Sequence, residues 1–170
     1  DSSDAARLEA FFRAIPEDDR TFFKEDISDP ETLRSIVADA RSLRLISLAD
    51  GAIEGYVAVL PGIGLSSHVG EVRLLVVPPR RRSGVGRELA RRALVGAVRE
   101  LSLRKLFVEV VAEQEPAIRM FQKLGFVAEA ILRDHLCDRA RKMQDLVLLA
   151  HFVDETWAGM QGLGLDRELG

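Results

Sequence analysis

The stretch that says most about this chain lies between residues 74 and 89. It reads Leu74-Leu75-Val76-Val77-Pro78-Pro79-Arg80-Arg81-Arg82-Ser83-Gly84-Val85-Gly86-Arg87-Glu88-Leu89. An apolar run ended by two prolines predicts a buried strand that stops at Val77. The basic turn and the Gly-x-Gly that follow open an amphipathic helix predicted over 84–102. Unpaired N–H groups and the helix dipole point outward at such a helix start, so this arrangement is typical of a phosphate cradle.

Two further features bear on what this loop binds. Gly84 and Gly86 would let a ligand approach the backbone, but a dinucleotide loop is disfavoured because the third glycine of Gly-x-Gly-x-x-Gly would fall on Leu89. Residues 73–105 hold 10 basic and 2 acidic side chains, a net charge of +8, whereas the whole chain carries -3. A basic stretch in an acidic protein favours a local anionic ligand, and the alternative is a solvated, arginine-rich helix.

The rest of the chain alternates between helical and strand periods. Helices are predicted at 5–14, 16–23, from Asp29-Pro30-Glu31 to about 40, at 116–125 and at 154–160. Strands are predicted at 43–49, 52–60, 70–77, 105–111, 127–136 and 143–152, the first two joined by the turn Asp50-Gly51. This order predicts one α/β (α+β) domain over 1–170, with N-terminal helices (1–42), a core (43–152) and a tail (153–170).

Composition excludes several classes of protein. The single cysteine, Cys137, rules out an intrachain disulfide and a zinc site of the usual several-cysteine kind, and no metal is expected. No apolar run approaches the roughly 20 residues of a membrane span, and no signal peptide is visible. With 47% hydrophobic and 30% charged residues, the chain is expected to be a cytoplasmic protein without a membrane partner.

Two blocks of sequence resemble the GNAT superfamily of N-acetyltransferases. Arg81-Arg82-Ser83-Gly84-Val85-Gly86 is similar to the signature Gln/Arg-x-x-Gly-x-Gly/Ala, although many members have glycine where Arg82 stands. Gln114-Glu115-Pro116-Ala117-Ile118-Arg119-Met120-Phe121-Gln122-Lys123-Leu124-Gly125-Phe126 is similar to the segment Asn-x-x-Ala-x-x-x-Tyr-x-x-x-Gly-Phe. The resemblance covers about 43–152, and the family's usual first strand has no counterpart before Ala5.

The resemblance implies a mixed, mostly antiparallel sheet flanked by helices. This sheet would be splayed between the strands at 72–77 and 105–110, with acetyl-CoA in the gap. The pantetheine arm would pair with backbone groups of Leu75, Val76 and Val77. The pyrophosphate would rest on the N–H groups of Arg81, Arg82, Ser83, Gly84, Val85, Gly86 and Arg87.

The second block departs from the family at two positions that would contact the cofactor. Gln114 stands where the family has an asparagine and keeps the amide on a longer stem. Phe121 stands where the family has a tyrosine that protonates the departing thiolate, and phenylalanine cannot donate a proton. Core packing is the expected physical role of Phe121. Tyr56 is the only tyrosine in the chain.

Acetyl transfer to an amine needs a base for the ammonium proton and stabilisation of the developing oxyanion. Direct transfer needs no enzyme nucleophile, so Cys137 is not required. Glu71 is the first candidate base, since it matches the glutamate base of histone-acetylating relatives. An exposed strand-end glutamate is the alternative reading of Glu71. Further candidates are Glu109, on the strand face opposite Leu106 and Val108, and the histidines His135, His68 and His151.

The sequence therefore predicts an acetyl-CoA-dependent N-acetyltransferase. It would transfer the acetyl group directly, in a ternary complex, to a primary amine of a small molecule or a protein. A longer acyl donor and a homodimer stay open. A non-catalytic module that binds acetyl-CoA for regulation is the alternative, and Phe121 alone favours it. A nucleic-acid partner is disfavoured because the chain is acidic and only 6% aromatic.

Overall fold

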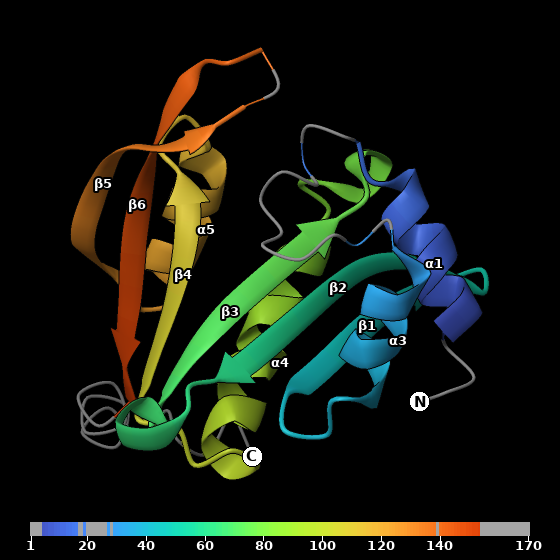
Figure 1. The fold of residues 1–170 in the computed structure, drawn as a ribbon, viewed down its shortest axis with the longest axis horizontal. Coiled ribbons are helices and arrows are strands. Elements are labelled where there is room, and N and C mark those ends of the chain that lie inside the picture. The colour runs from blue at the N-terminus through green and yellow to red at the C-terminus, as the bar shows by residue number, and fades with distance from the viewer. Residues whose placement is uncertain (1–4, 17–18, 20–26, 28, 139, 154–170) are drawn as a thin grey trace.

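The computed structural model describes residues 5–16, 19, 27, 29–138 and 140–153 (Figure 1). Its helices are α1 (Ala5–Ala14), α3 (Pro30–Ala38), α4 (Val85–Arg99) and α5 (Glu115–Lys123), with 3-10 turns at Gly64–Ser66 and Pro78–Arg80. Its strands are β1 (Leu43–Ala49), β2 (Ala52–Pro61), β3 (Val69–Val76), β4 (Lys105–Val111), β5 (Val127–Cys137) and β6 (Met143–Phe152). No helix in these ranges is long and apolar enough to cross a membrane.

The described elements match the sequence predictions closely. All six strands form where expected, with ends that differ by one residue at most. Asp29 caps α3, because its side chain accepts a hydrogen bond from the Thr32 N–H at 2.8 Å. The helix predicted over 84–102 ends earlier, at Arg99, and Ser102 takes a left-handed φ of 52°. The helices predicted at 16–23 and 154–160 fall mostly or wholly outside the described residues.

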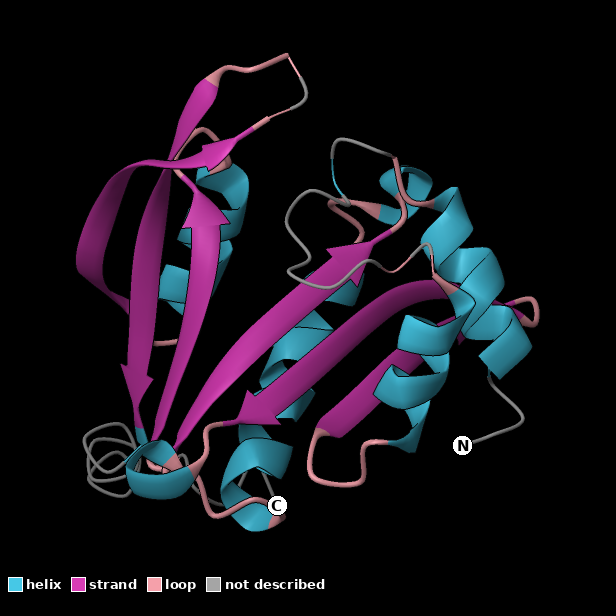
Figure 2. Cartoon of the chain, in the orientation of Figure 1, coloured by secondary structure: helices cyan, strands magenta, loops and turns pink. Residues whose placement is uncertain are grey.

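The six strands form one sheet in the order β1-β2-β3-β4-β6-β5. Four of its five pairings are antiparallel, and only β3 and β4 run parallel. This parallel pairing is short, because it joins Val69–Glu71 only to residues 105–107. Beyond it β3 and β4 diverge, so the sheet opens into a V whose vertex lies at the start of both strands (Figures 1 and 2). The splayed, mostly antiparallel sheet predicted from the sequence is confirmed.

Helices cover both faces of the sheet. One core packs α4 and α5 against one face and includes Val59, Val72, Leu106 and Phe121. A second core packs α1 and α3 against the opposite face of β1–β3. Tyr56 lies in this second core, 1% exposed and edge-on to Phe12. The only tyrosine of the chain is therefore a packing residue.

His151 is a buried histidine on β6, with 6% of its surface exposed. Its ring packs against Phe126 at 5.2 Å, and among the described residues its Nδ1 has no hydrogen-bond partner. Burial lowers the pKa of His151, although hydrogen bonds to the backbone of Gly125 and Leu124 partly oppose this effect. The folded state therefore holds His151 neutral while the unfolded chain titrates near the ordinary pKa of 6.5.

We therefore expect folding stability to be highest above pH 6.5 and to fall as the pH drops below it, because the unfolded state then takes up the proton more readily. Thermal unfolding between pH 8 and pH 5.5 measures this loss. His151→Leu should flatten that part of the profile, whereas His68→Gln, at an exposed histidine, should not. Equal pH profiles for the parent and His151→Leu would contradict the assignment.

Candidate active site

Glu71 lies at the vertex of the V, in the last residue pair that joins the two parallel strands. It faces Leu60 on β2 and Phe107 on β4. The alternation of β3 turns Gly70 and Val72 into the core with α4, so the Glu71 side chain points to the opposite face. The Glu71 side chain is only 17% exposed. The first candidate base is thus a half-buried residue at the point where β3 and β4 separate.

Glu71 forms an ion pair that the sequence analysis did not anticipate. Its two carboxylate oxygens accept hydrogen bonds from Nε and Nη2 of Arg73, at 3.0 and 3.2 Å. Both side chains are mostly covered, at 17% and 11% exposure. Residues i and i+2 share a face of a strand, which is the signal in the sequence that could have revealed this pair. The guanidinium holds the carboxylate in a fixed orientation.

Glu109 and His135, two of the further candidate bases, lie at different distances from this vertex. Glu109 lies two residues beyond Phe107 on β4 and on the same sheet face as Glu71, as the alternation predicted. His135 is exposed on β5, and its neighbour Leu136 pairs with Gln144 on β6. The β6 residue level with Phe107 is Ala150, six positions from Gln144, which corresponds to about 20 Å along a strand. The structure therefore places Glu71 and Glu109 on the same face of the sheet, with Glu109 just beyond the point where the strands separate, and leaves His135 apart.

Backbone groups on β3 line the side of the V that faces β4. The odd-numbered residues of β3 bond to β2, since the Val77 N–H donates to the Glu54 carbonyl at 3.0 Å and the Val69 carbonyl accepts from Gly62 at 2.8 Å. The even-numbered residues point their N–H and C=O groups away from β2 and into the V. The sequence analysis expected backbone contacts from Leu75, Val76 and Val77. The N–H and C=O groups of Val76 point into the V, whereas those of Leu75 and Val77 point toward β2. Leu74, which the sequence analysis did not select, also faces the V.

The start of α4 lies directly after the end of β3 and the turn that follows it. Gly84 is the N-cap in the left-handed region, with φ of 96°, and it has no side chain to occupy the amides of the first turn. The first helical bond runs from the Glu88 N–H to the Gly84 carbonyl at 3.0 Å. Gly86 faces the V, since a Cβ there would lie 3.3 Å from Val76 and 3.8 Å from the sulfur of Met120 on α5.

The arginines of this loop divide into paired and unpaired side chains. Arg80 forms an ion pair with Glu54, and Arg81 with Asp19. The Nε of Arg81 also donates to the Val76 carbonyl at 3.1 Å. Within the described ranges, Arg82 and Arg87 form no hydrogen bond or ion pair. These two therefore remain the free cations beside the α4 N-terminus.

Arg82 takes a left-handed φ of 62°. This backbone conformation costs a residue with a Cβ about 1 kcal/mol, and glycine adopts it without that cost. Many GNAT members have glycine at this position, and the geometry explains why glycine suits it. The structure does not explain why this chain carries arginine there.

The two unusual residues of the second block lie at the start and near the end of α5. Gln114 is the N-cap of α5, and its side-chain amide has no hydrogen-bond partner among the described residues. Phe121 is 3% exposed and packs edge-on against Phe126, with ring centres 5.2 Å apart. The expected core role of Phe121 is confirmed, and its contact with a cofactor stays a prediction.

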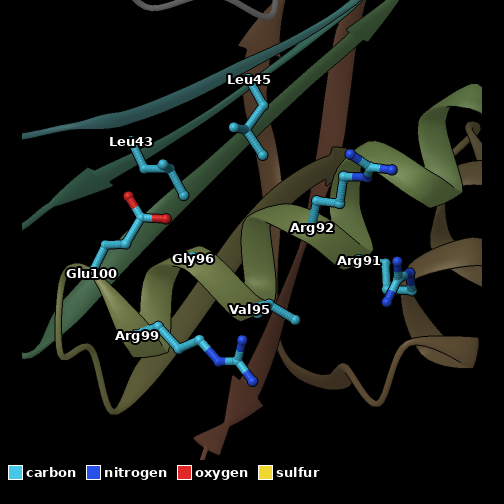
Figure 3. Close-up of a pocket in the computed structure, with 8 residues that line it drawn as sticks. All are labelled: Leu43, Leu45, Arg91, Arg92, Val95, Gly96, Arg99 and Glu100. Carbon is cyan, nitrogen blue, oxygen red and sulfur yellow. The ribbon is translucent and has the colours of Figure 1, made fainter. Parts of the chain in front are cut away.

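A pocket of about 340 Å³ lies elsewhere, between β1 and the C-terminal half of α4 (Figure 3). Its wall consists of Leu43, Leu45, Arg91, Arg92, Val95, Gly96, Arg99 and Glu100. It is therefore separate from the V between β3 and β4, and at the other end of α4 from the glycine loop.

A sheet that opens between two parallel strands, with an uncapped helix N-terminus and two unpaired arginines at its mouth, suits an extended, phosphate-bearing ligand. The model of the Acetyltransferase (GNAT) family matches residues 8–126. The chain belongs to this family. The match spans α1 to the end of α5, and so contains both blocks that the sequence analysis selected.

Known relatives agree with this assignment. Over 104 residues the chain is 26% identical to an N-alpha-acetyltransferase of Sulfurisphaera tokodaii, covering 55% of this chain and 61% of the relative. Over 110 residues it is 27% identical to the spermidine N(1)-acetyltransferase of Vibrio cholerae, covering 65% and 58%. The chain thus spans less than two thirds of these curated relatives.

Solved structures share the fold at lower sequence identity. A ribosomal-protein-alanine N-acetyltransferase of Brucella melitensis superposes with a TM-score of 0.76 at 19% identity, covering 89% of this chain and 96% of that one. The Salmonella typhimurium protein yncA, solved with its cofactor acetyl-CoA, gives 0.75 at 19% identity and covers 91% of both chains.

Proposed function

We propose that this chain is an acetyl-CoA-dependent N-acetyltransferase that acts on a primary amine. The observation that carries the proposal is the divergence of β3 and β4 directly beside the uncapped start of α4. An extended arm with one thioester end and one pyrophosphate end fits this arrangement, because backbone groups line the V and amides gather at its mouth. Family membership supports the same reading.

Different residues of the cleft would hold different parts of acetyl-CoA. The N–H groups from Arg82 to Arg87 would hold the pyrophosphate, with the free guanidiniums of Arg82 and Arg87 adding positive charge. The backbone of Leu74 and Val76 would pair with the pantetheine arm. The Gln114 amide would reach the arm from α5. Salt should weaken binding of acetyl-CoA, because the contacts with the pyrophosphate are partly ionic.

The acyl end of the arm would then reach the vertex, where Glu71 lies. An ammonium acceptor must lose a proton before its nitrogen can attack the thioester carbonyl. Glu71, oriented by Arg73, would take that proton directly or through water. The nitrogen then bonds to the carbonyl carbon and gives up its second proton to solvent as the carbon–sulfur bond breaks. The leaving thiolate takes a proton from solvent, since Phe121 has none to give. Transfer is direct, from the donor to the amine in a ternary complex.

Glu71→Gln should lower turnover by about 10²-fold, the usual contribution of a positioned base. The affinity for CoA should barely change, because the substitution leaves the α4 loop and the β3 backbone intact. Steady-state kinetics and calorimetry with CoA give both quantities. Parental turnover of Glu71→Gln across the pH range would mean that Glu109, His135 or water acts as the base instead.

Arg73→Gln tests the ion pair separately from the base. Without the guanidinium, the Glu71 carboxylate is no longer held in one orientation, so turnover should fall, but less than in Glu71→Gln. Steady-state kinetics of the two variants give this comparison. Parental turnover in Arg73→Gln would mean that the ion pair does not orient the base.

A second function, non-catalytic binding of acetyl-CoA, is favoured by one observation. Phe121 lies in the core with no proton to donate, so the route that a tyrosine supplies in the family is missing. This reading ranks below catalysis because Arg73 holds Glu71, the candidate base, in an ion pair at the vertex. Cytoplasmic location, a homodimer and the absence of nucleic-acid, membrane and metal partners remain predictions.

A further inference from the structure

The carboxylate of Glu54, on β2, lies beneath the turn that leads into the glycine loop. Only 8% of Glu54 is exposed. One of its oxygens accepts a hydrogen bond from the Ser47 hydroxyl on β1 at 2.8 Å, and the other accepts from Nε of Arg80. The hydroxyl of Ser47, followed by the guanidinium of Arg80, lowers the pKa of Glu54, so this carboxylate is ionised at neutral pH.

The backbone extends this network up to the glycine loop. The Glu54 carbonyl accepts the Val77 N–H at 3.0 Å, and the Val77 carbonyl accepts the Arg80 N–H at 2.9 Å. The Arg80 carbonyl then accepts the Ser83 hydroxyl at 2.6 Å. A continuous chain of hydrogen bonds thus runs from the β1–β2 hairpin to the residue before Gly84. Both the side chain and the carbonyl of Glu54 belong to it.

We propose that Glu54 is a positioning residue for the acetyl-CoA loop, acting through Arg80. It fixes the turn at residues 77–83, so that the amides at the start of α4 already point where the pyrophosphate binds. This inference rests on the proposed function. Holding a loop in its bound shape strengthens binding because less ordering is needed when the ligand arrives. Glu54 neutralises Arg80, so Arg80 supplies geometry while Arg82 and Arg87 supply charge.

The direction in which Glu54→Gln changes the affinity for CoA distinguishes a positioning role from a simple effect of charge. Glu54→Gln removes a negative charge near an anion site, so charge alone would tighten the binding of CoA. If Glu54 positions the loop, the substitution should instead weaken the binding of CoA, because Arg80 loses its charged partner. We expect the Kd for CoA, measured by calorimetry, to rise about tenfold, the size of one charge-assisted hydrogen bond. The KM for acetyl-CoA should rise with it, while kcat at saturating acetyl-CoA stays near the parental value.

A double-mutant cycle tests the route through Arg80. If Glu54 acts through this arginine, Glu54→Gln, Arg80→Gln and the double variant should weaken CoA binding by similar factors. Asp39→Asn is the matched control, because Asp39 likewise accepts hydrogen bonds from a serine hydroxyl (Ser42) and an arginine (Arg44), but in the turn before β1, near the opposite end of that strand. This control should bind CoA as the parent does. Tighter or unchanged binding in Glu54→Gln, or effects that add in the double variant, would overturn the proposal.

Hydrogen exchange of the ligand-free chain tests the role of Glu54 independently of whether the chain binds acetyl-CoA. Glu54→Gln should speed the exchange of the Arg80 and Arg81 amides, which donate to Val77 and Pro78, while Tm stays near the parental value. If the parent fails to bind CoA, the proposed function is wrong, and the exchange result still decides whether Glu54 orders the turn. Unchanged exchange at both amides would contradict the positioning role.

Discussion

Gly86→Glu should weaken the binding of CoA by about 10²–10³-fold, because a like charge placed against the pyrophosphate costs several kcal/mol. Gly86 lies in the first turn of α4 and faces the V, where a Cβ would meet Val76, Leu74 and Met120 at 3.3–3.8 Å. These contacts are with side chains and not with backbone, and a carboxylate near a helix N-terminus favours folding. The variant should therefore fold normally and lose its ligand.

Two further variants at this position separate bulk from charge. Gly86→Gln adds nearly the same volume without the charge and should cost less affinity than Gly86→Glu. Gly86→Ala adds only a methyl group and should cost least. Calorimetry with CoA at several salt concentrations measures all three, with thermal unfolding as the check on folding. Parental affinity in a folded Gly86→Glu variant would mean that the start of α4 is not the pyrophosphate site.

Phe121→Ala should lower the free energy of unfolding by about 3–5 kcal/mol, the usual cost of removing a fully buried aromatic ring. Phe121 is 3% exposed, and its ring meets Phe126 edge-on at 5.2 Å. Truncation would remove both the apolar contact area and this aromatic pair. Urea or thermal unfolding measures the loss, with Phe121→Leu as a milder control. A loss below about 1 kcal/mol would show that the ring does not support the core.

Phe121→Tyr tests the chemistry at the same position. A phenol can donate a proton to a thiolate, so turnover should stay level or rise if the hydroxyl reaches the cleft. A large fall in turnover would show that the site needs an apolar ring, and that the thiolate is protonated by another route.

Most of the fold could be predicted from local signals. The Asp50-Gly51 turn, the two prolines after β3 and the spacing of apolar residues in α4 each act over a few residues, and the structure confirms the elements that they indicate. The predicted end of α4 is three residues too late, because the apolar periodicity continues past Arg99 while the helical backbone conformation ends there. Helix ends depend on caps, and this one has no glycine to mark it.

The candidate site was predictable in part. The glycine loop and Glu71 follow from motifs, and the Glu71–Arg73 pair could have been read from strand alternation. The bonds from Arg80 to Glu54 and from Arg81 to Asp19 span 26 and 62 residues, so no local pattern reveals them. Which backbone groups of β3 face the V depends on the register with β2. In that register the backbone groups of Leu75 and Val77 face β2, and those of Leu74 face the V.

The most direct test of the account is acetyl transfer itself. The chain would be incubated with acetyl-CoA and a panel of primary amines, including polyamines and peptides with free N-termini, while free thiol and acetylated product are measured together. The account predicts thiol release that depends on the amine, matches the product in amount and falls about 10²-fold in Glu71→Gln. Acetyl-CoA binding without transfer to any amine would contradict it and favour the non-catalytic module.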